Sequence, residues 1–371
     1  MMADVIVTYC WNRVGYNIIR SLHRQGLKVV VGDSSKWNIC SLSKYSIDSF
    51  VYSDPFTQED NFISDLVDAI KKYKPKVLIP THDESLVIAR NKQRLPNDVI
   101  YATETTDLLL KLSDKYEATQ IAHSLGIPCP NIVLDYTQHS FPLVIKTKFG
   151  NSAKGVFFPN NINEADELVN SLETDEFFIE EFFEGVDYSV DCIRTDNFFF
   201  ASCYKALVTK TNGGGTTTQR IVVENDKLVN YARTLLDYVH YCGVCGLDFK
   251  VNETNGEAAF IEVNTRYTGG LATPIAAGFD IPAIHYSLLV NGIYDKPISV
   301  KIGTKTKWIL GDCIALVTKL WQRTLKKEEF IQIMKWNFDA FDDFFKDDKK
   351  AILGEMVYYL EKLIKNRKLN P

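Results

Sequence analysis

The fold is decided by the stretch GLDFKVNETNGEAAFIEVNTRYTGG, residues 246–270. Residues 246–251 alternate apolar and charged side chains, residues 258–263 are apolar again, and residues 252–256 between them are rich in turn-forming types. This pattern predicts two antiparallel strands joined by a tight turn.

Polar side chains gather on one face of this predicted hairpin. Because alternate residues of a strand share a face, Glu262, Asn264 and Arg266 point the same way. A turn centred near Thr254 places Asp248 about opposite Glu262. Buried like charges need a counter-ion, and oxygen ligands of this kind suit Mg²⁺, which commonly takes one or two carboxylates together with nucleotide phosphates. A solvated hairpin face with ordinary surface charges is the alternative.

The composition indicates an ordinary globular protein. A chain of 371 residues is long enough for two or three domains, and 46% apolar with 24% charged residues gives no sign of disorder. A net charge of -5 does not favour a nucleic-acid partner or an anionic membrane. Because the sequence has neither a signal peptide nor an apolar run of roughly 18 residues, we expect no membrane span and a cytoplasmic location.

The eight cysteines are scattered, which fits reduced thiols better than a disulfide framework. Only Cys242 and Cys245 have the spacing of a redox or zinc motif, and no second pair of cysteines or histidines completes a zinc site. Core packing is therefore the favoured interpretation, with redox chemistry as the alternative.

The first 106 residues have a βαβ pattern. Strands are expected over 4–9, 28–31 and 77–80, with helices over 16–25, 61–73 and from residue 84 onward. Such alternation implies a parallel sheet whose functional loops lie at the carboxyl ends of its strands. The loop of residues 81–84 could face a substrate through His82, or Thr81 or Asp83 could simply cap the following helix.

The remaining residues have a mixed pattern. A helix is expected over 108–125, and a polar, glycine-rich loop over 209–218 is a candidate lid, with Arg220 reaching a substrate carboxylate. A plain surface hairpin is the alternative for this loop. In the tail, residues 304–371, helices are expected over 326–334, 338–345 and 351–364. This tail is interpreted as a packing extension or an oligomer surface.

Two further segments carry polar residues in unusual settings. Residues 146–155 form a strand, a glycine-containing loop and a second strand with a basic start, which is either a phosphate-binding loop around Lys146 or a plain hairpin. In residues 180–187, Phe182 and Phe183 lie between carboxylates. That mixture suits a hinge around an adenine, and an exposed strand end is the alternative.

The order and spacing of these motifs resemble those of the ATP-grasp superfamily, in particular its carbamoyl-phosphate-synthase-like and D-alanine–D-alanine-ligase-like carboxylate–amine ligases. The resemblance covers about residues 1–300. It implies a fold of mixed α/β and α+β class, with a βαβ pre-ATP-grasp domain over 1–106 and an ATP-grasp domain over 107–303. The two lobes of the latter are about 107–183 and 184–303, and a helical C-terminal extension over 304–371 lies outside the resemblance.

The resemblance also implies roles for individual residues. Lys115 and Lys146 match the lysines that contact ATP phosphates, and the loop with Gly150, Ser152 and Gly155 matches the one that closes over them. The residues implied to hold adenine and ribose are Glu180, Glu181, Phe182, Phe183 and Asp187, the last standing where glutamate is commoner.

The remaining implied roles concern metal and substrate. Asp248, Glu262 and Asn264 match the ligands of Mg²⁺, for which two ions are expected. Arg266, together with Lys146, matches the catalytic residues that handle the phosphate or acyl phosphate. The candidate substrate residues are His82, Arg220, Thr268 and Gly269.

The chemistry implied by the resemblance is an ATP-dependent ligase reaction that forms a C–N bond through an acyl phosphate. Small-molecule carboxylate and amine substrates are expected as partners, and a homodimer is possible. Phosphorylation of a carboxylate without amide formation, and a non-catalytic ATP-binding regulatory protein, are the alternatives. Residue types alone do not name the substrates.

Overall fold

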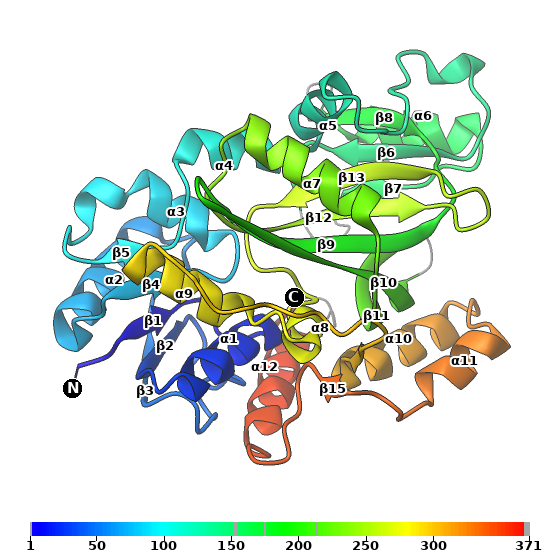
Figure 1. Cartoon of the computed structure of the whole chain (residues 1–371). Coiled ribbons are helices and arrows are strands. Elements are labelled where there is room, and N and C mark those ends of the chain that lie inside the picture. Colours follow the sequence, from blue (N-terminus) through cyan, green and yellow to red (C-terminus); the bar gives the residue numbers. More distant parts are fainter. Residues whose placement is uncertain (1, 151–154, 174–175, 212–213, 367–371) are drawn as a thin grey trace.

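The computed structural model describes residues 2–150, 155–173, 176–211 and 214–366. Its strands form three sheets with flanking helices, and the N-terminal sheet lies on the opposite side of the molecule from the smallest sheet (Figure 1). The predicted mixture of α/β and α+β architecture is confirmed.

The N-terminal unit is a five-stranded parallel sheet in the order β3-β2-β1-β4-β5. Its strands are β1 (Val5–Val7), β2 (Val29–Asp33), β3 (Asp48–Val51), β4 (Val77–Ile79) and β5 (Ile100–Tyr101). Its helices are α1 (Arg13–Arg24), α2 (Glu59–Tyr73) and α3 (Glu84–Arg90), followed by a 3₁₀ turn at Lys92–Arg94. Val5 and Val7 belong to the hydrophobic core that contains α1, whereas Ile6 belongs to the core that contains α2. The sheet is therefore buried on both faces, as parallel sheets are.

The smallest sheet is antiparallel, in the order β7-β6-β8. It consists of β6 (Leu143–Thr147), β7 (Val156–Phe157) and β8 (Phe177–Glu181), and α6 (Ile162–Ser171) packs on it. Helices α4 (Thr106–Ser113) and α5 (Lys115–Ser124) precede this sheet, and buried residues of both belong to the core of the largest sheet. A second 3₁₀ turn at Tyr136–Gln138 precedes β6.

The prediction of one helix over 108–125 is wrong at its centre. Asp114 is extended, with φ -73° and ψ 107°, and separates α4 from α5. Its Oδ1 accepts hydrogen bonds from the backbone N–H groups of Tyr116 and Glu117 at 2.9 and 3.1 Å. An aspartate in this position caps a new helix, and Lys115 is consequently the first residue of α5.

The largest sheet has seven strands, in the order β13-β12-β9-β10-β11-β14-β15. They are β9 (Val186–Thr195), β10 (Phe198–Thr211), β11 (Gly214–Val223), β12 (Gly243–Val251), β13 (Ala258–Asn264), β14 (Lys305–Lys307) and β15 (Ala340–Phe341). The associated helices are α7 (Asp226–Tyr238), α8 (Ala272–Ala277) and α9 (Ile281–Asn291). Most of the predicted glycine-rich loop is strand, because β10 and β11 pair as far as Thr211 and Gly214. The described part of this segment is thus a hairpin of two paired strands, and its role as a lid stays a prediction.

The tail is largely helical but also joins the largest sheet. Its helices are α10 (Ile309–Trp321), α11 (Lys327–Ile333) and α12 (Ala351–Asn366). The predicted helix over 338–345 is wrong, because β15 forms there and pairs in parallel with β14. Asp343 accepts hydrogen bonds from the N–H groups of Ile309 and Leu310 at 3.1 and 2.9 Å. Its side chain therefore caps α10.

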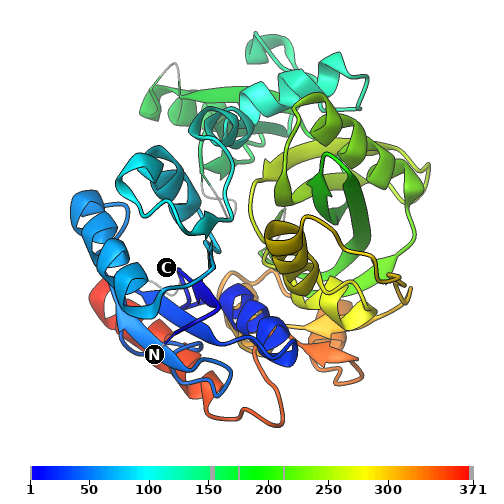
Figure 2. The same ribbon diagram turned by 60° about the vertical axis from the view of Figure 1, so that its left-hand side comes forward.

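One hydrophobic core joins the N-terminal sheet, helix α9 and the tail. It includes Val5 of the N-terminal sheet, Ile284 of α9, and Phe345 and Ala351 of the tail. In Figure 2, α12 lies beside the N-terminal sheet, far from the smallest sheet. No helix among the described residues is long and apolar enough to cross a membrane.

The loop after β4 is held by a buried carboxylate. Glu84 is fully buried and accepts hydrogen bonds from Thr8 Oγ1 at 2.8 Å, from the Thr81 N–H at 2.9 Å and from the His82 N–H at 3.0 Å. The capping that the sequence suggested is not made, because the Asp83 side chain forms no capping hydrogen bond and Thr81 Oγ1 donates to carbonyl groups of the first loop. Burial raises the pKa of Glu84 to about 7.

Replacing this carboxylate should flatten the pH dependence of stability. Between its ordinary pKa of 4.5 and about 7, Glu84 holds a proton in the folded state that the unfolded chain has lost. Its contribution to stability is therefore complete below pH 4.5 and is lost as the pH rises through 7. Urea unfolding across this range should show a smaller loss of unfolding free energy for Glu84→Gln than for the unchanged protein.

A matched control is Glu59→Gln, at the start of α2. The pKa of Glu59 is lowered by its hydrogen bond from Arg90, and so its titration lies below this pH range. The control should keep the slope of the unchanged protein. Equal slopes for Glu84→Gln and the unchanged protein would contradict the prediction.

Candidate active site

The predicted hairpin is present with the predicted pairing. β12 and β13 run antiparallel, and Asp248 lies opposite Glu262. The amide nitrogen of Asn264 donates to Asp248 Oδ2 at 2.9 Å and lies 3.5 Å from Glu262 Oε1. The three residues predicted to hold a metal therefore meet on one face of the largest sheet.

The neighbouring strand β9 adds two polar residues that the sequence reasoning missed. Ser189 lies opposite Asp248 and donates to its Oδ1 at 2.5 Å, while Asp191 lies opposite Gly246. The signal was present in the sequence, because Asp187, Ser189 and Asp191 alternate along a strand and therefore share a face. The carboxylate face of the sheet thus extends from β13 across β12 to β9.

The two opposed carboxylates are only partly compensated. Burial and, to a smaller extent, the nearby Glu262 raise the pKa of Asp248 to about 7, while the hydrogen bond from Ser189 acts in the opposite direction. Lys115 Nζ lies 3.8 Å from Glu262 Oε2. Burial lowers the pKa of Lys115, and the attraction of Glu262 opposes that effect. Two opposed carboxylates of which only Glu262 pairs with an ammonium group can accept a further cation.

The residues present fit Mg²⁺, provided that other oxygen atoms complete its shell. In the described part of the chain, no group of three or more His, Cys, Asp or Glu side chains could hold a metal ion by itself. Asp248 and Glu262 supply two carboxylates, and the carboxamide of Asn264 can present its oxygen by turning over. Mg²⁺ usually takes one or two carboxylates and fills its shell with phosphate oxygens and water.

Lys115 reaches this face from the first turn of α5. It is 6% exposed, its backbone N–H donates to the Lys148 carbonyl at 2.9 Å, and its ammonium group donates to the carbonyl of Gly150. The capping of α5 by Asp114 fixes where this side chain leaves the helix. The structure therefore connects the start of the predicted phosphate loop to the carboxylate face through one lysine.

Lys146 forms a buried ion pair with Glu180. Lys146 Nζ lies 2.6 Å from Glu180 Oε2, and the two side chains are 5% and 1% exposed. The ammonium group is not aligned as a hydrogen-bond donor to the carboxylate. Burial raises the pKa of Glu180, and the charge of Lys146 lowers it. The lysine predicted to meet phosphates is thus already neutralised by the glutamate predicted to meet adenine.

The rest of the predicted hinge lies at the end of β8 and the start of β9. Glu181 accepts a hydrogen bond from Asn131 Nδ2 at 2.7 Å, and Phe182 is 40% exposed with its ring 6.2 Å from that of Phe158. Phe183 is half-buried, and Asp187 forms an ion pair with Lys250 at 2.7 Å. A ribose contact by Asp187 would have to compete with this pair.

The predicted phosphate loop is described only at its ends. Gly150 and Gly155 have φ of 139° and 76°. At Gly155 a Cβ atom would collide with the Thr147 side chain, so a larger residue there would have to displace it. Ser152 lies outside the described residues.

The turn after β13 faces the N-terminal unit. Arg266 Nε donates to Asp83 Oδ1 at 3.0 Å, and the neighbouring His82 ring stacks on Tyr9 with centroids 5.0 Å apart. Thr268 Oγ1 donates to the buried Asp191, with its oxygens 2.8 and 3.0 Å away. The predicted substrate residues His82, Thr268 and Gly269 are therefore brought to one boundary, and Asp83 joins them although the sequence did not single it out for this role.

Arg220 is already paired with a carboxylate of the tail. It is fully buried, forms an ion pair with Asp342 of the tail at 2.8 Å, and donates to both oxygens of Thr217 and to the carbonyl of Gly269. A substrate carboxylate at Arg220 would therefore have to displace Asp342.

Removing one partner of the Lys146–Glu180 pair should destabilise the protein. Lys146→Met leaves a carboxylate in a site that is almost fully buried, which costs about 3 kcal/mol or more. The double variant Lys146→Met with Glu180→Gln removes both charges and should recover most of that loss in urea unfolding.

Lys148→Met makes the same change two residues further on, at a half-buried position. This control should change the unfolding free energy by less than about 1 kcal/mol. The prediction fails if the double variant is less stable than Lys146→Met.

The family model described as the ATP-grasp domain matches residues 112–270. The chain is 28% identical over 163 residues to a D-alanine–D-alanine ligase of Fusobacterium nucleatum, in a match that covers 41% of this chain and 55% of that relative. The match thus spans about half the length of the curated relative.

Solved structures share the fold over most of the chain. The biotin carboxylase–β,γ-ATP complex of Campylobacter jejuni superposes with a TM-score of 0.67 at 14% identity, over 82% of this chain and 74% of that one. The ADP complex of an N5-carboxyaminoimidazole ribonucleotide synthetase gives 0.66 at 16% identity, over 87% and 86%. At these identities the superpositions establish the fold, and the match to the ATP-grasp family model is confined to residues 112–270.

Proposed function

We propose that the protein is an ATP-dependent ligase that joins a small carboxylate to an amine through an acyl phosphate. The single observation that supports it best is the juxtaposition of Asp248, Glu262 and Asn264 beside Lys115. Carboxylates placed opposite one another destabilise a structural sheet, and a bound nucleotide with its metal would use them.

ATP would lie against the face that carries these residues. Lys115 and Lys146 would offset the charge of its phosphates, and residues around 180–183 would hold the adenine. Asp248, Glu262 and Asn264 would hold Mg²⁺, which when bound supplies positive charge to the phosphate oxygens. The number of ions, two by the resemblance, belongs to this proposal.

The two steps of this reaction need no nucleophile from the protein. An oxygen of the substrate carboxylate attacks the γ-phosphorus and releases ADP, which leaves an acyl phosphate. The amine then attacks the carbonyl carbon, inorganic phosphate departs, and the nitrogen loses a proton. Transfers of this kind depend on positioning and charge neutralisation.

Arg266 is the residue of this chain assigned to the acyl phosphate. Its guanidinium is held by Asp83 at 3.0 Å, from the loop that also carries His82. This contact supports a substrate site between the N-terminal unit and the turn after β13. The β10–β11 hairpin is the candidate cover that would keep water from the acyl phosphate.

The partners of this reaction are small molecules, a carboxylate and an amine, and the D-alanine–D-alanine ligase similarity supports amino acids as the first ones to test. The homodimer and the cytoplasmic location stay predictions.

The test is release of ADP and phosphate from Mg²⁺-ATP in pools of small carboxylates and amino acids. The unchanged protein should turn over only when a carboxylate and an amine are both present, and mass spectrometry should find their condensation product. Glu262→Ala should reduce turnover by about 100-fold or more, because charge stabilisation at the phosphates is lost. Glu257→Ala, at an exposed carboxylate of the same hairpin, should retain it.

The other results separate the alternatives. Release with the carboxylate alone would favour phosphorylation without amide formation. Tight ATP binding without turnover in any pool would favour a regulatory ATP-binding protein over a ligase of these substrates. Unchanged turnover in Glu262→Ala would show that the metal assignment is wrong.

A further inference from the structure

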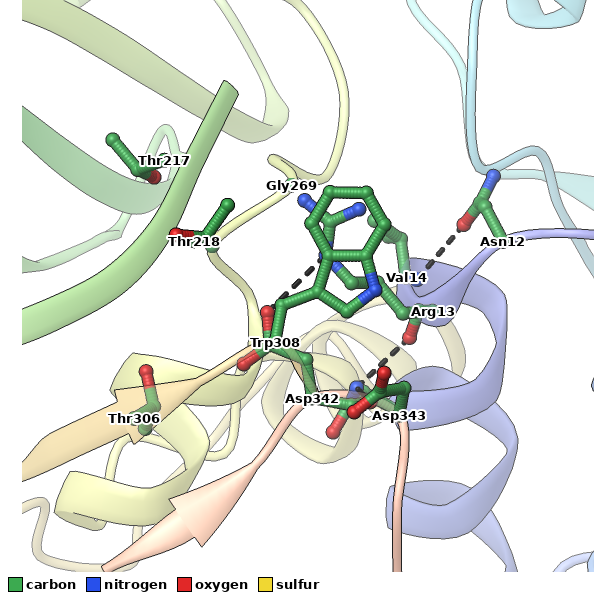
Figure 3. A network of polar contacts seen from close by, with 12 residues as sticks. Asn12, Arg13, Val14, Thr217, Thr218, Gly269, Thr306, Trp308, Asp342 and Asp343 are labelled. Carbon is green, nitrogen blue, oxygen red and sulfur yellow. Dashed lines mark hydrogen bonds and ion pairs between the residues drawn. The ribbon is translucent and has the colours of Figure 1, made fainter. Parts of the chain in front are cut away.

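Two arginines and one aspartate meet where three distant segments of the chain come together. Figure 3 shows Arg13 and Asp342 of this cluster. Arg13 begins α1, Arg220 lies on β11, and Asp342 follows β15 in the tail. Asp342 Oδ2 lies 3.2 Å from Arg13 Nε and 2.8 Å from Arg220 Nη1. One carboxylate oxygen therefore pairs with both guanidinium groups.

This cluster is closed to solvent. Arg13, Arg220 and Asp342 are 7%, 0% and 0% exposed. The Trp308 ring covers Arg13, with the guanidinium carbon 3.7 Å from the ring centroid, as Figure 3 shows. In such surroundings two cations that lose their shared counter-ion would face each other with little screening.

The tail segment that carries Asp342 is firmly placed. Its backbone N–H donates to the Lys307 carbonyl at 2.9 Å, and its carbonyl accepts from Asn17 Nδ2 at 2.8 Å. Asp343 caps α10 and forms no ion pair with either arginine among the described residues. The position of the Asp342 carboxylate is thus set by β15 and α1 together.

The cluster contacts the turn that follows the predicted metal ligands. Arg220 Nη2 donates to the Gly269 carbonyl at 3.4 Å, and a Cβ atom at Gly269 would lie 2.9 Å from Arg13 Nη2. On the other side, Thr268 Oγ1 donates to Asp191. The turn is thus held between the carboxylate of Asp191 and the two arginines.

We propose that Asp342 is a positioning residue for the ligase reaction, acting through Arg13 and Arg220 on residues 266–269. This inference rests on the proposed function, because Arg266, at the start of that turn, is the group assigned to the acyl phosphate. The tail is then a working part of the active site, although it supplies no group to the nucleotide. A small displacement of a group that positions the reacting atoms lowers the rate of the chemical step more than it weakens substrate binding.

The test compares Asp342→Asn with Asp343→Asn. The two changes are isosteric, adjacent and equally buried, but only the first removes the counter-ion of the arginines. Asp342→Asn should lower kcat for ADP release by about 10- to 100-fold, while the KM for ATP stays within about twofold because the phosphate lysines are untouched. Asp343→Asn should keep the kcat of the unchanged protein, even if its melting temperature falls as much as that of Asp342→Asn.

Hydrogen exchange measures the same effect without turnover. Amide protons of residues 265–271 should exchange faster in Asp342→Asn than in Asp343→Asn or the unchanged protein. If the unchanged protein has no ligase activity, the proposed function fails and exchange alone decides the positioning role. If Asp342→Asn does not fold, Arg220→Lys replaces it, because lysine keeps the charge but loses the fork that reaches Gly269.

Two results would overturn the inference. One is equal kcat and equal exchange in the two aspartate variants. The other is a raised KM for ATP with an unchanged kcat, which would assign Asp342 to nucleotide binding or to general stability.

Discussion

The structure depends on two carboxylates that lie opposite each other on antiparallel strands. Side chains in such a pair are about 5 Å apart, and like charges there oppose pairing. Asp248 and Glu262 are tolerated because Ser189, Asn264 and Lys115 donate to them or pair with them. Ser189 and Asn264 come from the same sheet, but Lys115 comes from helix α5. The charge of the site therefore helps to hold α5 against the largest sheet.

The period of two predicted the hairpin and the polar face on which Asp248 and Glu262 lie. It did not predict the register shift between Asp248 and Phe249 that brings these two residues opposite each other. The sequence pattern failed at Asp114, where a single side chain stops one helix and starts the next within an apolar pattern that runs through both. It also failed over 338–345, because the contacts that decide this segment are made with residues far away in the sequence. Asp342 and Arg13 are separated by 329 positions, and no local pattern indicates such a pair.

Lys146 and Glu180 show how resemblance and geometry complement each other. The resemblance gave each residue a contact with ATP, and the structure pairs them at 2.6 Å on adjacent strands. Burial raises the pKa of Glu180, and the charge of Lys146 opposes that effect. The pair therefore compensates a carboxylate that would be costly to bury alone.

The proposed substrate side of the site is harder to predict for a physical reason. The proposed nucleotide side is built from one continuous region in which motif order carries information. The residues proposed for the substrate side come from the loop with Asp83 and the turn with Arg266, and the proposed positioning residue Asp342 comes from the tail. Arg220 illustrates the consequence: its residue type suggested a free carboxylate receptor, whereas the tail supplies that carboxylate. If this contact positions the turn after β13 as proposed, the shape that the turn offers to a substrate depends on a segment that the family resemblance leaves out.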